Sequence, residues 1–185
     1  MNSVLLDTGP LVALLDRSEP DHDRVKRCMA RLHGSRLVTT GAVITEAFYF
    51  LSDVLDGPSS LASFLDASAT EVRDAFCGEA LTAAIGLMSK YADVPMDFPD
   101  ATLVWIAELS GTDRILTLDR RGFTSFRYQK NRRFKLLLER KTIRSPALAT
   151  RRVLHILLLP RCSPQHLRSR PRIPLHLGTA QSRSQ

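Results

Sequence analysis

The sequence predicts an α/β fold in which a mostly parallel central sheet is covered by helices on both faces. Two features of the first 138 residues carry this prediction. Short apolar stretches of the length of buried strands alternate with longer segments whose apolar side chains recur at helical spacing. Strands that alternate with helices usually pair in parallel, because each helix returns the chain to the edge where the previous strand began.

The first predicted elements begin and end at local signals. Pro10 stands near the start of a helix, where its fixed φ is favourable, and Thr40 is placed to cap a later helix. Gly57 and Pro58 end that later helix, and Ser59 begins the next one. We predict a strand over residues 4–6, helices over 11–15 and 21–32, a strand over 36–39, and helices over 43–55 and 59–67. The helix over 43–55 is predicted to bury Val43, Ala47, Phe50 and Leu51.

The second half contains one ambiguous segment, residues 70–76, which fits either a strand or the edge of a helix. Pro99 and Asp100 are typical of a helix start. We predict helices over 79–91 and 100–109, a strand over 114–118, and closing strands over 125–128 and 133–138. The helix over 79–91 is predicted to bury Leu81, Ala84, Ile85 and Met88 on one face.

The charge distribution divides the chain of 185 residues near Leu138. Residues from Arg140 onward contain ten of the 26 Lys and Arg side chains and none of the 19 acidic ones. The first 139 residues therefore carry 16 basic and 19 acidic side chains, a net charge of −3, although the whole chain carries +7. We predict a globular domain over residues 1–138 and a basic, disordered and dispensable extension over 139–185, with a tail that binds RNA as the alternative.

Several classes of protein are disfavoured by the composition. The three cysteines are far apart and lack the spacing of a zinc site, which indicates a reduced, cytoplasmic setting. The first ten residues have no basic region like that of a signal peptide, and no apolar run is long enough to span a bilayer. Glycine-rich nucleotide loops and the GxSxG nucleophile motif are absent from the sequence.

Four carboxylates are placed where such a fold brings side chains together. Asp7 and Asp119 each directly follow a predicted strand, Asp100 lies in the first turn of a helix, and Glu46 lies in the helix after the second strand. In open parallel sheets, ligands bind beyond the carboxyl ends of the strands. Carboxylates that converge there must hold protons or bind a hard cation, and Mg²⁺ or Mn²⁺ suits oxygen ligands. The sequence therefore predicts hydrolysis of a phosphodiester with a divalent ion.

Each of these acids also has a simpler interpretation. Asp100 is placed like a helix cap or a partner of the helix dipole, Asp119 could begin a turn, and Glu46 could be a solvated surface residue. Asp7 is the hardest to explain in this way, because it interrupts an apolar run. Asp97 is a secondary candidate close to the third motif.

Four segments, in order, resemble the motifs of PIN-domain ribonucleases and of VapC-type toxins in particular. They are LLDTGPLVALLD (residues 5–16), TTGAVITEAFYFL (39–51), MDFPDATLVWIAE (96–108) and ILTLDRRGF (115–123). The resemblance covers about residues 3–137 and implies a PIN-like three-layer sandwich. It also implies that Asp7 and Asp100 are the main Mg²⁺ ligands, while Glu46 and Asp119 complete the catalytic pocket. Thr117 matches a hydroxyl position that supports this pocket, and Thr8 is a weaker supporting candidate.

The resemblance further implies a homodimer, an RNA substrate and a cognate antitoxin that covers the active site. The leading hypothesis is an Mg²⁺-dependent endoribonuclease that acts as the toxin of a type II toxin–antitoxin system. The alternatives are a PIN-like module that binds RNA or protein without catalysis, and an RNA-processing nuclease without an antitoxin. Basic residues near the domain end are either RNA phosphate contacts or a solvated edge: Arg120, Arg121, Arg127, Lys130, Arg132 and Arg133.

Overall fold

A computed structural model of the chain describes residues 2–139. The predicted extension, residues 139–185, lies outside the described residues except for Glu139. In chain order the elements are β1 (Ser3–Leu6), α1 (Thr8–Leu15), α2 (His22–Arg31), β2 (Arg36–Thr40), α3 (Gly41–Leu51), α4 (Gly57–Ala67), β3 (Glu71–Arg73), α5 (Gly78–Lys90), α6 (Phe98–Ser110), β4 (Arg114–Leu116), α7 (Arg120–Ser125), β5 (Arg127–Tyr128), β6 (Arg132–Arg133) and β7 (Lys135–Leu136).

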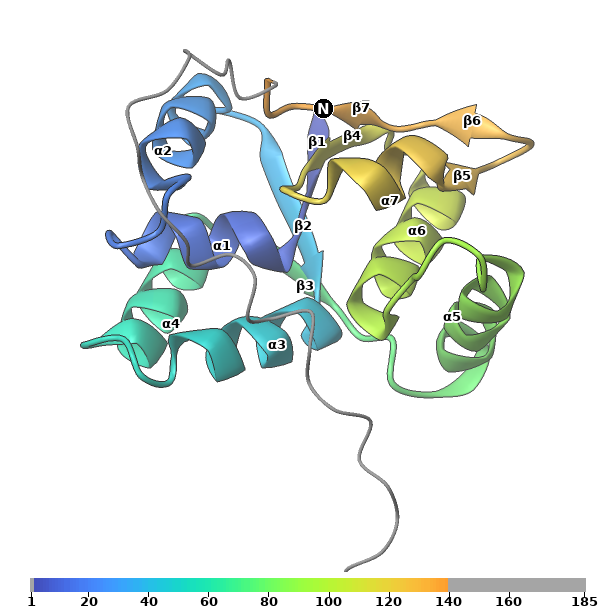
Figure 1. The fold of residues 1–185 in the computed structure, drawn as a ribbon, viewed down its shortest axis with the longest axis horizontal. Helices are drawn as coiled ribbons and strands as arrows, with labels where there is room; N and C mark the ends of the chain where they lie inside the picture. Colours follow the sequence, from blue (N-terminus) through green and yellow to red (C-terminus); the bar gives the residue numbers. More distant parts are fainter. Residues whose placement is uncertain (1, 140–185) are drawn as a thin grey trace, which may run out of the picture. The chain divides into compact units, whose positions relative to one another are not determined.

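The central sheet has five parallel strands in the order β3-β2-β1-β4-β7. Helices α1 to α4 lie on one side of this sheet, and α5 to α7 lie on the other (Figure 1). The predicted α/β class, with a parallel sheet between two helical layers, is therefore confirmed. The sheet is the centre of the core, since the side chains of Leu5, Leu6, Ile115 and Leu116 have no more than 1% of their surface exposed.

The structure corrects the predicted elements near the end of the domain. The strand predicted over 114–118 ends at Leu116, and residues 120–125 form helix α7, which was not predicted. The closing segments do not form two long strands. Instead, β5 and β6 pair with each other as an antiparallel ribbon, and only β7 joins the main sheet. The ambiguous segment 70–76 contains the edge strand β3.

Two of the predicted buried faces are only partly correct. Val43, Ala47 and Leu51 are buried on α3, but Phe50 is 46% exposed. On α5, Ala84 is buried, whereas Ile85 is 53% exposed. In both helices the covered stripe is narrower than the apolar stripe in the sequence, so helical spacing alone overstated the buried surface. Among residues 2–139, no helix has the length and apolar character needed to cross a membrane.

Candidate active site at the carboxyl edge of the sheet

Asp7 and Thr117 lie side by side where two neighbouring strands end. Strands β1 and β4 pair in parallel with Leu6 opposite Leu116, so the residues that follow them leave the sheet at the same level. The Asp7 backbone N–H donates to the Leu116 carbonyl at 3.1 Å. The Thr117 hydroxyl donates to Asp7 Oδ2 at 2.7 Å. Residues 110 positions apart are thus joined by parallel strand pairing.

Asp7 is a buried carboxylate that also caps a helix. Its side chain is 7% exposed, and its Oδ1 accepts a 2.7 Å hydrogen bond from the backbone N–H of Thr8 at the start of α1. Burial raises the pKa of Asp7 from 3.8 to about 7, and the hydrogen bonds from Thr117 and Thr8 only partly oppose that rise. The charges of Asp97 and Glu46 raise the pKa further. Asp7 therefore exchanges a proton near neutral pH.

Asp100 lies in the first turn of α6 and is 8% exposed. The Asp97 side chain caps this helix by accepting the Asp100 backbone N–H at 2.9 Å. Burial raises the pKa of Asp100 to about 9, and the charges of four neighbouring carboxylates, on Asp7, Asp97, Asp119 and Glu46, raise it as well. Every influence on this group favours its neutral form. Asp100 thus needs a proton or a bound cation at neutral pH.

Glu46 reaches the same cluster from α3. Thr40 caps α3 by accepting the Val43 backbone N–H at 3.4 Å, and its hydroxyl bonds to the Thr102 hydroxyl of α6 at 2.8 Å. This contact ties α3 to α6 beside Asp100. Burial raises the pKa of Glu46, the Thr8 hydroxyl opposes the rise, and the charge of Asp97 adds to it. Glu46 keeps partial contact with solvent.

Asp119 performs the simpler role considered for it and also belongs to the cluster. Its carboxylate accepts the backbone N–H groups of Arg121 and Gly122 and so caps α7. Its own backbone N–H donates to the Thr117 hydroxyl at 2.8 Å. Its charge raises the pKa of both Asp97 and Asp100, which places it within electrostatic range of them.

The structure brings Asp7, Glu46, Asp100 and Asp119 into one electrostatic cluster, as the sequence predicts. Asp97, the secondary candidate, belongs to it as well. Part of Asp97 is exposed to solvent, and the surrounding protein still raises the pKa of its carboxyl by partial burial. The charge of Asp119 adds to that rise. In the sequence, Asp97 was a candidate only because it lies close to the third motif. The structure adds that Asp97 caps α6.

The donor set fits a hard divalent cation. The groups are carboxylates, two of them are buried, and the charged groups that act on Asp7 and Asp100 are all negative. A divalent ion would offset their mutual repulsion and replace the protons that burial otherwise favours. Among residues 2–139, no group of three or more histidine, cysteine, aspartate or glutamate side chains is arranged so that it could hold a metal ion.

The basic side chains near the domain end divide into two groups. Arg120 donates to the Leu138 carbonyl at 2.7 Å, and Arg127 donates to the carbonyls of residues 124, 125 and 126 at the end of α7. These two guanidinium groups therefore hold backbone in place. Lys130 and Arg133 are exposed on and beside the β5–β6 turn and form no ion pair with residues 2–139.

Comparison with known proteins agrees with this geometry. A model of the family described as the PIN domain matches residues 4–127. The chain belongs to the PIN-domain family. Ribonuclease VapC26 of Mycobacterium tuberculosis is 31% identical over 135 residues, which are 72% of this PIN-domain chain and 99% of VapC26. VapC20 of the same organism, described as a sarcin-ricin loop cleaving toxin, has a TM-score of 0.58 and 18% identity, covering 63% of this chain and 90% of that one. The second likeness shows a shared fold.

Proposed function

We propose that this PIN-domain protein is an Mg²⁺-dependent endoribonuclease and the toxin of a type II toxin–antitoxin system. The observation that carries the proposal is the burial of Asp7 and Asp100 within one cluster of carboxylates at the carboxyl edge of the sheet. A cluster of this kind serves phosphodiester hydrolysis once a divalent ion is bound. The identity to Ribonuclease VapC26 over most of the chain supports RNA as the substrate.

In this proposal Asp7 and Asp100 hold the ion, with Mn²⁺ as an alternative to Mg²⁺. The ion supplies a more acidic water and stabilises negative charge on a phosphodiester oxygen. Thr117 and Thr8 fix the Asp7 carboxylate by one hydrogen bond to each of its oxygens. This leaves Asp7 in one orientation before any ligand binds, which is the role of supporting residues around a metal ligand.

Glu46 and Asp119 complete the catalytic pocket. Glu46 is half-buried and has a raised pKa, which makes its carboxylate a stronger base toward the attacking water. Asp119 is held by two backbone N–H groups at the start of α7, and this fixes its carboxylate beside Thr117. Glu46 lies on α3 and Asp119 caps α7, and both helices begin after strands of the central sheet.

An exposed apolar surface on α3 supports the predicted protein partners. Phe48, Tyr49 and Phe50 are 39%, 75% and 46% exposed, and Leu55, beyond the end of α3, is 90% exposed. Tyr49 and Phe50 lie three and four residues after Glu46 on α3 and so share its helical face, which places a protein that covers them beside the Glu46 end of the acidic pocket. A cognate antitoxin that blocks RNA access suits this surface, and we extend the proposal to a homodimer and a cytoplasmic location.

The test is cleavage of a mixed RNA pool by the full chain in Mg²⁺, in Mn²⁺ and in EDTA. We expect cleavage with either ion, none in EDTA, and none from Asp7→Asn. The matched control is Asp53→Asn, which changes an exposed acid outside the cluster and should cleave like the unchanged protein. Equal cleavage in EDTA, or by Asp7→Asn, would contradict the proposal. Ion-independent RNA binding without cleavage would support a binding module instead.

A further inference from the structure

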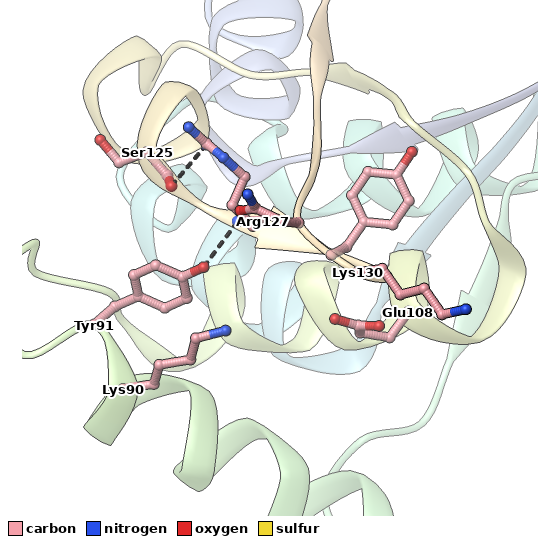
Figure 2. A pocket seen from close by; sticks show the side chains of 8 residues that line it. Lys90, Tyr91, Glu108, Ser125, Arg127 and Lys130 are labelled. Carbon is pink, nitrogen blue, oxygen red and sulfur yellow. Dashed lines mark hydrogen bonds between the residues drawn. The ribbon is translucent and has the colours of Figure 1, made fainter.

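A polar cavity lies apart from the acidic cluster, between the end of α5, the second half of α6 and the β5–β6 ribbon. Its volume is about 520 Å³, within the range of sites that hold small organic ligands. Figure 2 shows the side chains of Lys90, Lys130 and Glu108 around it. Its lining residues are Lys90, Tyr91, Glu108, Ser125, Arg127, Tyr128, Lys130 and Asn131.

The lining carries three cationic side chains and one carboxylate. Arg127 is committed to the carbonyls at the end of α7, so its guanidinium forms part of the wall. Lys90 lies over the ring of Tyr91, with its Nζ atom 5.2 Å from the ring centroid. Among residues 2–139, neither Lys90 nor Lys130 has an ion-pair partner. Two exposed ammonium groups are therefore available to an anion at this cavity.

The wall that carries Lys130 is preformed. Gln129, Lys130 and Asn131 have φ values of 28°, 52° and 76°, a left-handed conformation that non-glycine residues seldom adopt. Glu108 stabilises it, because its carboxylate accepts the Gln129 backbone N–H at 2.8 Å and its carbonyl accepts the Gln129 side-chain amide at 2.7 Å. The first of these bonds holds the Glu108 carboxylate in place, and its negative charge stays in the wall beside the three cationic side chains. Strain of this kind persists where neighbouring contacts enforce it.

One tyrosine hydroxyl is available as a donor. The Tyr91 hydroxyl accepts the Arg127 backbone N–H at 2.9 Å, which leaves its own proton free to donate. Tyr128 is 1% exposed and belongs to the wall of the cavity, but its hydroxyl is buried. The charged groups that act on that hydroxyl are Arg132, Asp113 and Lys135, which do not line the cavity.

We propose that this cavity binds one nucleotide of the RNA strand through its phosphate, outside the acidic centre that cleaves the RNA. Ammonium groups beside aromatic side chains are typical of sites for single-stranded nucleic acid. Helix α6 connects the two sites: Asp100 lies in its first turn, and Glu108, eight residues later, lines the cavity. At 1.5 Å per residue, this places them about 12 Å apart along the helix axis. The inference rests on the proposed ribonuclease function, because RNA is the substrate it assumes.

The experiment measures binding of a labelled single-stranded RNA oligonucleotide by fluorescence anisotropy, in EDTA so that no cleavage occurs. The full chain is compared with the double variant Lys90→Gln/Lys130→Gln. This variant removes both charges and keeps a non-glycine residue at position 130, whose φ is positive, so that the backbone there is equally constrained. The control, Lys26→Gln/Arg27→Gln, removes two exposed charges from α2.

We expect the Lys90/Lys130 variant to bind about tenfold more weakly, with the slope of log affinity against log salt less steep by about 1.4. That change corresponds to two lost phosphate contacts on a single strand, and the α2 control should retain the original slope. An unchanged slope in the Lys90/Lys130 variant, or an equal loss in the control, would overturn the inference.

A kinetic measurement separates this inference from the proposed function. With Mg²⁺, the Lys90/Lys130 variant should show a raised KM and an unchanged kcat, because the cavity contributes binding that is equal in the ground and transition states. Cleavage with an unchanged KM refutes the cavity as an RNA site and leaves the ribonuclease proposal intact. If the unchanged protein cleaves no RNA, the ribonuclease proposal fails, and the anisotropy comparison still decides whether the cavity binds RNA.

Discussion

Replacing Asp100 with asparagine should stabilise the protein in the absence of a divalent ion. In the folded chain the pKa of Asp100 is raised to about 9, whereas its ordinary value is 3.8. Between those values the unfolded chain has lost a proton that the folded chain keeps, so the free energy of unfolding falls as pH rises. For each pH unit above the ordinary pKa, the free energy of unfolding falls by about 1.4 kcal/mol, so by pH 7 the protein has lost about 4 kcal/mol of stability. Asparagine carries no titrating proton and avoids this loss.

The assay is urea denaturation in EDTA at about pH 4.5 and pH 7, comparing the unchanged protein, Asp100→Asn and the exposed-acid control Asp53→Asn. The Asp100 carboxylate accepts no hydrogen bond from residues 2–139, so the substitution should remove little else. We expect Asp100→Asn to be stabilised by between about 1 and 4 kcal/mol at pH 7, with most of the gain gone at the lower pH. A gain that is absent at pH 7, or equal at both pH values, would refute the reasoning. The control should change little.

Three further predictions concern the same pocket. Thr117→Val removes the hydroxyl between Asp7 and Asp119 and should lower kcat by about 10- to 100-fold, measured as RNA cleavage at saturating substrate; an unchanged kcat would show that the hydroxyl does not support the pocket. Gly122→Ala should destabilise the fold by about 1 to 3 kcal/mol in urea denaturation, because the added β-carbon overlaps the Asp119 carboxylate and lies 2.8 Å from the Phe126 ring. Mg²⁺ should raise Tm more at about pH 8 than at about pH 5, since it competes with protons for buried carboxylates, and EDTA should reverse the rise; equal shifts at both pH values would count against a carboxylate site.

The sequence predicted the site best where strand pairing alone determines position. Asp7 and Asp119 follow apolar runs, and parallel strands of one sheet end at the same edge, so their proximity followed from topology. For Glu46 and Asp100 the topological argument was weaker, because a helix can present an acid in many directions, and the family motifs added the support that it lacked. The distances, the burial of Asp100 and the direction of each pKa shift depend on how α3 and α6 pack, which apolar spacing does not specify.

The end of the domain was predicted least well. No element was predicted over residues 119–124, but α7 forms there because Asp119 caps it and Gly122 lets that carboxylate approach. The strands predicted over 125–128 and 133–138 are reduced to the short strands β5, β6 and β7. The cavity beside the β5–β6 ribbon was not predicted at all. It depends on three successive left-handed residues, and although asparagine adopts that conformation readily, no local sequence rule assigns it to Gln129 and Lys130 before Asn131.

The simple and the functional interpretations of these acids turn out to describe the same residues. Asp7, Asp97 and Asp119 each cap a helix that begins at the carboxyl edge of the sheet. Helix starts carry partial positive charge, and this favours nearby carboxylates. Burial nevertheless dominates, because the pKa of Asp7 and of Asp100 still rises. The caps therefore fix the positions of the acids without neutralising them, and the remaining negative charge is what a divalent ion would satisfy.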